Sequence, residues 1–155
     1  MLNESLYFKE TDFIDTIEKD VTEIFSSEEA ISLFDTQIYV SSDFDAISDS
    51  LIFPCIFIDI ESSSANLTHA VASQTQQYSD FILTFEIYSK QVKEITPAKA
   101  TKLIAEFLIK NLQQKYNLFV LSSNRPLPNL DITISRRMVS FRGTINNQTF
   151  MVYSG

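Results

Sequence analysis

The most constraining part of the sequence runs from Tyr78 to Leu118, where the hydrophobic periodicity changes from that of a strand to that of a helix. Residues 79 to 90 alternate, so that successive side chains point to opposite faces of a sheet. Because both faces are largely apolar, we expect this strand to lie in the middle of the sheet. The two sets are Phe81, Leu83, Phe85 and Ile87 on one face, and Ile82, Thr84, Glu86 and Tyr88 on the other.

A helix is predicted to follow this strand after one short turn. Thr96 can accept hydrogen bonds from the free N–H groups of a helix start, and Pro97 has the fixed φ that suits the first helical position. Apolar residues then recur at steps of three and four, while charged residues fall on the opposite side. The apolar stripe, which we expect to face the core, consists of Ala100, Leu103, Ile104, Phe107, Leu108, Leu112 and Tyr116.

The N-terminal third is expected to be helical. Thr11 can cap a first helix whose apolar stripe includes Phe13 and Ile17 and whose acidic, exposed side includes Asp20. Ser27, followed by two glutamates, predicts the start of a short second helix. Acidic residues in a first turn also interact favourably with the positive end of a helix dipole.

Further strands are expected on either side of a polar segment. Residues 37–40 predict a short strand, and Leu51 to Ile60 predict a longer one that begins near Cys55, because Pro54 cannot donate to a ladder. Residues 62–77 are rich in serine and lack large aromatic side chains, a composition that cannot bury enough surface to order itself. We therefore expect a flexible arm at about 62–77 between two adjacent antiparallel strands.

The C-terminal third predicts two more strands. Arg125 to Asn129, which includes two prolines, is expected to be extended and turn-like. Asp131 to Ile145 predicts a long strand whose apolar parity changes, and a bulge near Arg136 to Met138 would reconcile the two halves. Asn146-Asn147-Gln148 predicts a hairpin turn that returns through Phe150 to Tyr153.

The expected fold is α+β, with a mainly antiparallel β-sheet packed against one long helix and the N-terminal helices. The expected element order is α-α-β-β-α-β-β, without an internal repeat. At 155 residues and 45% hydrophobic, the chain can bury one sizeable core, so we expect a single domain spanning residues 1–155.

Composition excludes several kinds of chemistry. Gly143 and Gly155 are the only glycines, so neither a phosphate-cradling loop nor a dinucleotide fingerprint is possible. Cys55 is the only cysteine, which excludes a disulfide framework, and it is expected to be a buried, inert thiol. His69 is the only histidine and lacks convergent partners, so we expect no enzyme activity, no cofactor and no metal site. We expect no export signal and no membrane anchor, because the start lacks a positively charged region and no apolar run approaches the ~20 residues of a membrane span.

The net charge of −8 is unevenly divided along the chain. Residues 1–80 carry two lysines and sixteen acids, a net charge of −14, whereas residues 81–155 carry ten basic residues and four acids, a net charge of +6. The two halves can pair within one subunit, or head to tail between neighbouring subunits. Arg136, Arg137 and Arg142 form the only basic cluster with interleaved aromatic residues. We expect them to form ion pairs within or between subunits, because the acidic chain disfavours binding to a nucleic-acid backbone.

From about Leu51 to its end, the chain resembles the tail-terminator (tail-completion or minor tail) proteins of long-tailed bacteriophages. The resemblance rests on five segments, which are Phe53-Pro54, Ile87-Tyr88-Ser89, Thr96-Pro97-Ala98, Ile134-Ser135-Arg136-Arg137 and Phe141-Arg142-Gly143. It implies a sheet backed by helices and a hexameric ring at the top of the tail tube. Such a ring ends tube polymerisation and provides the surface on which the head connector docks.

The resemblance also implies partners and a location. The expected partners are further copies of the chain, the tail tube protein and the head–tail connector or neck protein. Genomic DNA is expected only to pass through the ring, and no membrane is involved. The protein is expected in the virion, at the neck end of the tail, after assembly in the host cytoplasm. Another neck component, either a head-completion or a connector-adaptor protein, is the alternative, followed by a nucleic-acid-binding module. The expected interface residues are Arg136, Arg137, Arg142, Asn146, Asn147, Ser62, Ser63, Ser64, Asn66, His69 and Gln74.

Overall fold

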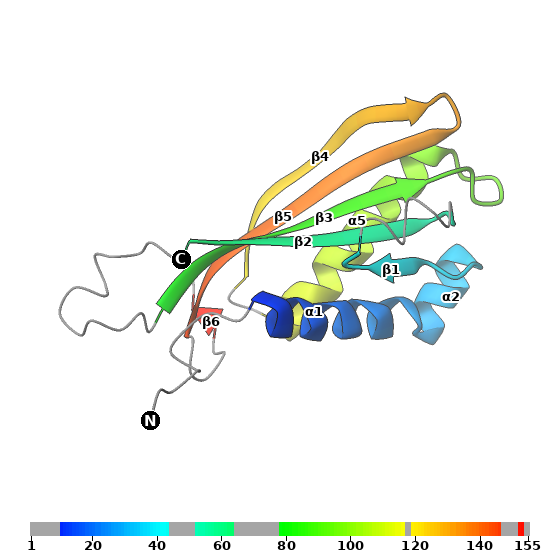
Figure 1. Cartoon of the computed structure of the whole chain (residues 1–155). Helices are drawn as coiled ribbons and strands as arrows, with labels where there is room; N and C mark the ends of the chain where they lie inside the picture. Colours follow the sequence, from blue (N-terminus) through cyan, green and yellow to red (C-terminus); the bar gives the residue numbers. More distant parts are fainter. Residues whose placement is uncertain (1–9, 44–51, 64–77, 117–118, 147–151, 154–155) are drawn as a thin grey trace.

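The fold is a mainly antiparallel sheet with helices against one of its faces (Figure 1). The structure is a computed structural model that describes residues 10–43, 52–63, 78–116, 119–146 and 152–153. The α+β class and the order of the main elements are confirmed, with a short strand near residues 37–40 and a 12-residue strand over residues 120–131 in addition. In chain order the elements are α1 (Glu10–Phe25), α2 (Glu28–Phe34), β1 (Tyr39–Ser41), β2 (Cys55–Ser63), β3 (Tyr78–Ser89), α5 (Pro97–Lys115), β4 (Val120–Asp131), β5 (Ile134–Asn146) and β6 (Val152–Tyr153).

The strand order across the sheet is β1-β2-β3-β5-β4, and β6 pairs with the end of β5. Strand β1 runs parallel to β2, while β2, β3, β5 and β4 are each antiparallel to the next. Strand β3 lies in the middle, as its two apolar faces predicted. One row across the sheet joins Glu61, Ile82, Arg142 and Val120.

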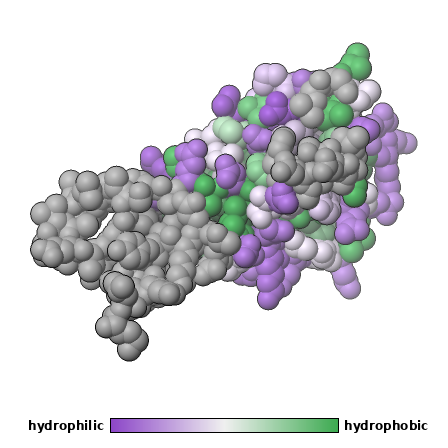
Figure 2. Space-filling view, in the orientation of Figure 1, coloured by the Kyte–Doolittle hydropathy of each residue, from purple (hydrophilic) through white to green (hydrophobic). Residues whose placement is uncertain are grey.

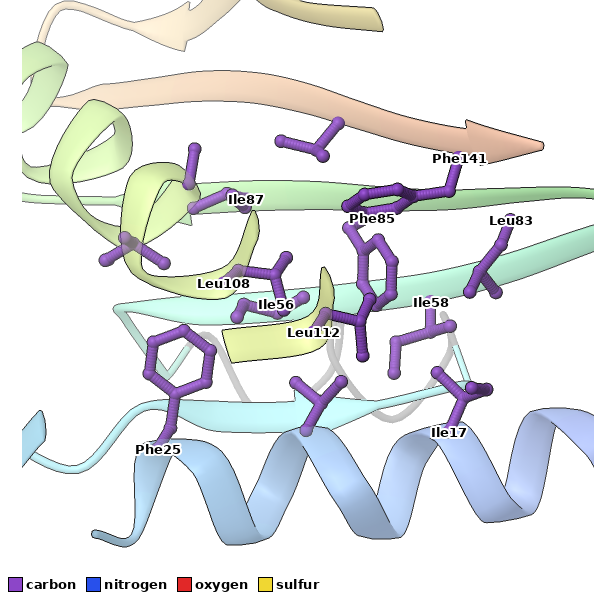
Figure 3. Packing of buried hydrophobic residues seen from close by; sticks show 14 of the residues in the cluster. Ile17, Phe25, Ile56, Ile58, Leu83, Phe85, Ile87, Leu108, Leu112 and Phe141 are labelled. Atoms are coloured by element: carbon purple, nitrogen blue, oxygen red, sulfur yellow. The ribbon is translucent and has the colours of Figure 1, made fainter. Parts of the chain in front are cut away.

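The core lies between the sheet and the helices. Odd-numbered residues of β3 and β5 point into it, so Phe85 packs edge to face on Phe141 with ring centroids 6.0 Å apart. Figure 3 shows apolar side chains of α1 and α5 packed against this face. Fully burying one such side chain contributes about 1.5–3 kcal/mol. The largest fully buried side chains are Phe81, Phe85, Phe141, Ile17, Ile56, Ile58, Leu83, Ile87, Ile104, Leu108 and Leu112.

Two of the three expected helix caps are confirmed. The Thr96 hydroxyl accepts a hydrogen bond from the N–H of Lys99 at the start of α5, and the Ser27 hydroxyl accepts one from Ala30 at the start of α2. The expectation for Thr11 is wrong, because α1 already includes Glu10. An acidic side chain suits that first turn, since the helix dipole places positive charge there.

Strand β4 corrects two expectations for the C-terminal third. It includes Arg125–Asn129, which we expected to be turn-like. The strand tolerates its two prolines because it lies at the edge of the sheet, where a missing N–H does not interrupt the pairing of two central strands. The expected bulge does not lie in β5, which pairs with β3 without a register shift from Ser135 to Asn146; the irregularity lies in β4, between Leu127 and Asp131, opposite Arg136 and Ile134. The apparent change of parity arises because Ile132, 95% exposed, belongs to the turn before β5.

The first two residues of the expected arm belong to a strand. Strands β2 and β3 are antiparallel neighbours, as expected, but β2 continues to Ser63, so Ser62 pairs with Phe81 and Ser63 with Asp80. The rest of the expected arm, residues 64–77, lies outside the described residues. The expected return strand is present as β6, while residues 147–151 of the predicted hairpin turn are not described.

Candidate interaction surface

The second face of the sheet carries no described helix, and we call it the open face. In Figure 1 helix α5 lies behind the sheet, so the view is onto this face, and Figure 2 shows hydrophobic and hydrophilic residues side by side on it. Pairing across the strands brings its members together. They include Cys55, Phe57, Asp59 and Glu61 of β2, Ile82, Thr84, Glu86 and Tyr88 of β3, and Arg136, Met138, Ser140 and Arg142 of β5.

An aromatic cluster occupies the end of the open face near β1. Cys55 and Tyr88 are buried there, and Tyr39, Phe53 and Phe57 pack against them. Burial raises the pKa of the Cys55 thiol to about 12, so the group stays protonated at neutral pH. The expectation of a buried thiol is confirmed.

A polar network joins Glu86, Tyr88 and Arg136 beside this cluster. The Tyr88 hydroxyl donates to Oε2 of Glu86 at 2.5 Å, and Nη2 of Arg136 lies 3.8 Å from the same oxygen. The guanidinium Cζ of Arg136 lies 5.4 Å from the centroid of the Tyr88 ring. Burial, followed by the hydrogen bond to Glu86 and its negative charge, raises the pKa of Tyr88 to about 12. Arg136 is therefore engaged within its own subunit.

The three arginines that the sequence grouped together do not form one site. Arg136 and Arg142 lie on the open face, whereas Arg137 points to the helix side and donates from Nε to Oδ1 of Asn124 at 2.7 Å. Arg142 is exposed and pairs across the strands with Ile82, which is 46% exposed. Within the part of the chain that the structure describes, Arg136 alone of the three has an acidic partner.

The other expected interface residues lie at the opposite end of the sheet or are not described. Ser62 and Ser63 end β2, and Asn146 ends β5 opposite Tyr78, so β3 separates these two strand ends. Asn147, Ser64, Asn66, His69 and Gln74 lie outside the described residues. Ser62, Ser63, Asn146 and Arg142 therefore lie toward the same end of the sheet, away from Arg136.

Part of the charge division is neutralised inside the subunit. Lys93 pairs with Asp35 at 2.6 Å and Lys115 with Asp20 at 2.8 Å, and both pairs join the basic half to the acidic half. Arg125 and Arg142, which are exposed on β4 and β5, form no ion pair with any described residue. These two pairs neutralise a small part of the division, and exposed positive charge is left on β4 and β5.

The exposure of Asp20 differs from what the sequence predicted. We expected it on the exposed side of α1, but it is buried, because the end of α5 covers it. Nζ of Lys115 and the hydroxyl of Tyr116 both donate to its carboxylate. Burial and then this hydrogen bond raise the pKa of Tyr116, while the hydrogen bond to Asp20 raises the pKa of Lys115. Its position in the sequence does indicate this burial, because Asp20 lies three residues after buried Ile17 and so shares its face of the helix.

The described residues of the helix side line several open hollows. One of about 230 Å³ lies between α2 and α5, with Leu33, Leu103 and Phe107 in its wall and Glu29 and Lys110 at its rim. No three described His, Cys, Asp or Glu side chains gather closely enough to hold a metal ion. Of the described helices, none combines the length and the apolar character of a membrane span.

The scan against protein-family models finds no match, and the search of curated proteins finds no relative. Inference about function therefore depends on the fold, on the surface chemistry and on the sequence resemblance.

Proposed function

We propose that the protein is a structural virion protein of a long-tailed phage, a tail terminator that assembles as a ring on the end of the tail tube. The ring ends tube polymerisation and presents the docking surface for the head connector. The partners in this proposal are further copies of the chain, the tube protein and the neck protein. The sheet backed by helices agrees with the fold that the resemblance implies.

The observation that carries the proposal is the exposure of β4. This strand has 12 residues at the edge of the sheet and is largely exposed on both of its faces. An edge strand presents unpaired N–H and C=O groups, which readily pair with another chain. Its exposed residues are Leu121, Ser122, Asn124, Arg125, Pro126, Pro128 and Asn129. Such a strand supports a role in assembly.

A cap on a tube needs two unlike surfaces. A tail tube is an open head-to-tail assembly, in which every added ring presents the same surface to the next one. The cap must offer one surface that bonds to the tube and a second that does not. Here the sheet side presents the open face with its mixed polar and apolar residues, while the helix side exposes charged residues such as Asp15, Glu23 and Glu28. These two sides are chemically unlike.

Electron microscopy of a lysate that lacks the protein tests the proposal. We expect tails of uncontrolled length that do not join heads. Tails of normal, uniform length would overturn the terminator assignment and favour a head-completion or connector-adaptor protein of the neck. Native mass spectrometry of the purified protein is the companion measurement, and a hexamer is the expected species. Salt-sensitive binding to short DNA with no assembly would instead favour a nucleic-acid-binding module.

A further inference from the structure

We infer that the tip of the β4–β5 hairpin of one copy docks into the hollow between α2 and α5 of the next copy, with Ile132 as the anchoring side chain. This contact rests on the proposed ring, whose neighbouring subunits it joins. It follows from one fully exposed apolar side chain, from an apolar hollow on the opposite flank of the subunit and from the charges that the two flanks carry.

Ile132 is the most exposed large hydrophobic residue in the part of the chain that the structure describes, at 95%. It lies in the turn that joins β4 to β5, two strands of 12 and 13 residues, and so stands at the tip of a long hairpin (Figure 1). Pairing along both strands holds the tip in place, so little conformational entropy is lost when it binds. A partner that covers Ile132 removes its apolar surface from water, which is favourable.

The hollow between α2 and α5 has apolar walls. Leu33 lines it and, at 55%, is second only to Ile132 in exposure among the described large hydrophobic residues. The hollow measures about 230 Å³, whereas an apolar cavity of ~150 Å³ already accepts a benzene-sized guest. It therefore has room for one aliphatic side chain. Its other lining residues are Phe34, Leu103 and Phe107 in the walls, and Glu29, Glu106 and Lys110 at the rim.

The tip and the hollow lie at the same end of the sheet but on opposite flanks. Strand β4 is the last strand on one side, whereas α2 leads into β1, the last strand on the other side. The ion pair of Lys93 with Asp35, at 2.6 Å, holds the end of α2 beside the turn that follows β3. That turn comes after Ser89, which pairs with Ser135 next to the start of β5. The end of α2 and the hairpin tip are therefore at the same end of the strands (Figure 1).

This placement determines how a second copy adds. A copy in the same orientation beside β4 brings its α2 flank toward the hairpin tip of the first copy. Each copy then supplies one tip and one hollow, so the contact is heterologous and every further copy repeats it. A heterologous contact that turns by a constant angle closes into a ring.

The charges of the two flanks are complementary. On the hairpin, Arg125 of β4 is exposed and Arg137 of β5 points to the helix side, and neither has an acidic partner among the described residues. Helix α2 carries exposed Glu28 and Glu29 and no basic residue. Together with Glu106 these acids outnumber Lys110, so the surroundings of the hollow are negative. Like charges disfavour contacts of hairpin with hairpin or of α2 with α2, so the occupant of the hollow is the hairpin of another copy of this chain.

Paired cysteines test the contact directly. The Cys55→Ser background removes the only native thiol, and Ile132→Cys with Leu33→Cys then places one thiol on the tip and one in the hollow. A short bismaleimide should join this protein into a ladder of covalent oligomers on a denaturing gel. An equal mixture of the two single-cysteine proteins should stop at dimers, because each subunit then carries only one reactive group. Moving the second thiol from Leu33 to Ile31, which is exposed to a similar degree but lies outside the hollow, should largely remove the ladder.

Aspartate substitutions test how much the contact contributes. Ile132→Asp and Leu33→Asp should each weaken association about tenfold or more, because each removes an apolar contact and introduces a charge that the hollow would have to desolvate. The matched control is Ile31→Asp, a substitution at similar exposure on the same helix, which should leave the ring intact. Sedimentation velocity measures the association, and circular dichroism checks that each variant is folded.

The outcomes separate this contact from the proposed function. Rings that persist in both aspartate variants would overturn the hairpin contact, leave the proposed ring standing and leave the hollow open to the tube or neck protein. Rings whose paired cysteines give no ladder would overturn the contact in the same way. Equal weakening by Ile31→Asp and Leu33→Asp would show that the hollow is not the docking site. A wild-type protein that stays monomeric at every concentration would overturn the proposed function and the hairpin contact with it.

Discussion

Tyr116, the residue that follows α5, donates a hydrogen bond to the carboxylate of Asp20 in α1. Nζ of Lys115 lies 2.8 Å from the other carboxylate oxygen. The two contacts tie the end of α5 to the middle of α1. A buried carboxylate is costly unless it is paired and hydrogen-bonded, and these two donors are what allow α1 to carry one against the core.

Removing this carboxylate should destabilise the fold. Asp20→Ala is expected to lower the free energy of unfolding by about 1–3 kcal/mol, because the partly buried Tyr116 hydroxyl loses its acceptor. Lys115→Ala should cost less than about 1 kcal/mol, since the lysine is half exposed. Urea unfolding measures both losses. Asp15→Ala, an exposed site on the same helix, is the control and should stay within about 0.5 kcal/mol of wild type. Equal losses at Asp15 and Asp20 would contradict the role of the network.

Alkaline pH should destabilise the protein through Tyr88. Its pKa is raised to about 12 in the folded state, against about 10 for an ordinary tyrosine. A group with a raised pKa stabilises the fold below its unfolded pKa, and that contribution is lost as the pH rises through the folded value. Stability should therefore fall between about pH 10 and 12, and the fall should be shallower in Tyr88→Phe. Tyr116 acts with the same sign, so its own Phe variant is the matched comparison. Identical pH profiles for wild type and Tyr88→Phe would refute the assignment.

Local periodicity was sufficient to predict the faces of β3 and α5, because each element packs one regular stripe on a single core. It was insufficient for β4. Whether Pro126 and Pro128 end a strand depends on whether that strand lies at an edge, and strand order is a property of the whole sheet. The burial of Asp20 was not predicted for a related reason, since its partners Lys115 and Tyr116 lie more than 90 residues away in the sequence.

The candidate interaction surface was likewise only partly predictable from the sequence. Alternation along a strand predicts that Arg136 and Arg137 point to opposite faces, and the structure agrees. The contact of Arg136 with Glu86 and Tyr88 could not be predicted, because it depends on the register between β3 and β5. The unpaired half of β2 likewise follows only from the short length of β1.

The thiol of Cys55 should resist modification. It is fully buried and its pKa is raised to about 12, so the reactive thiolate is scarce and inaccessible at neutral pH. A disulfide-exchange reagent should react with it only after the protein is unfolded in guanidinium chloride, and absorbance follows the released thiolate. Cysteine placed at exposed Asp59 in a Cys55→Ser background is the positive control for a reactive site. Stoichiometric modification of native Cys55 within the dead time of mixing would show that this end of the open face is not closed.

Arg136 and Arg142 occupy the same face of β5 but should respond oppositely to substitution. Arg136 is engaged by Glu86 and the Tyr88 ring, so Arg136→Ala should cost about 1 kcal/mol of stability and leave assembly unchanged. Arg142 is exposed and has no described acidic partner, so Arg142→Glu should change stability by less than about 0.5 kcal/mol.

Assembly should show the opposite order of effects. Reversing Arg142 places a negative charge on the exposed basic strands, which in the proposed ring would meet an acidic flank of a neighbouring copy, so rings should weaken most at low salt, where screening is least. Light scattering at two salt concentrations, together with urea unfolding, separates the two effects. If Arg142→Glu lowered the unfolding midpoint while the oligomer persisted at both salt concentrations, Arg142 would be assigned to its own subunit.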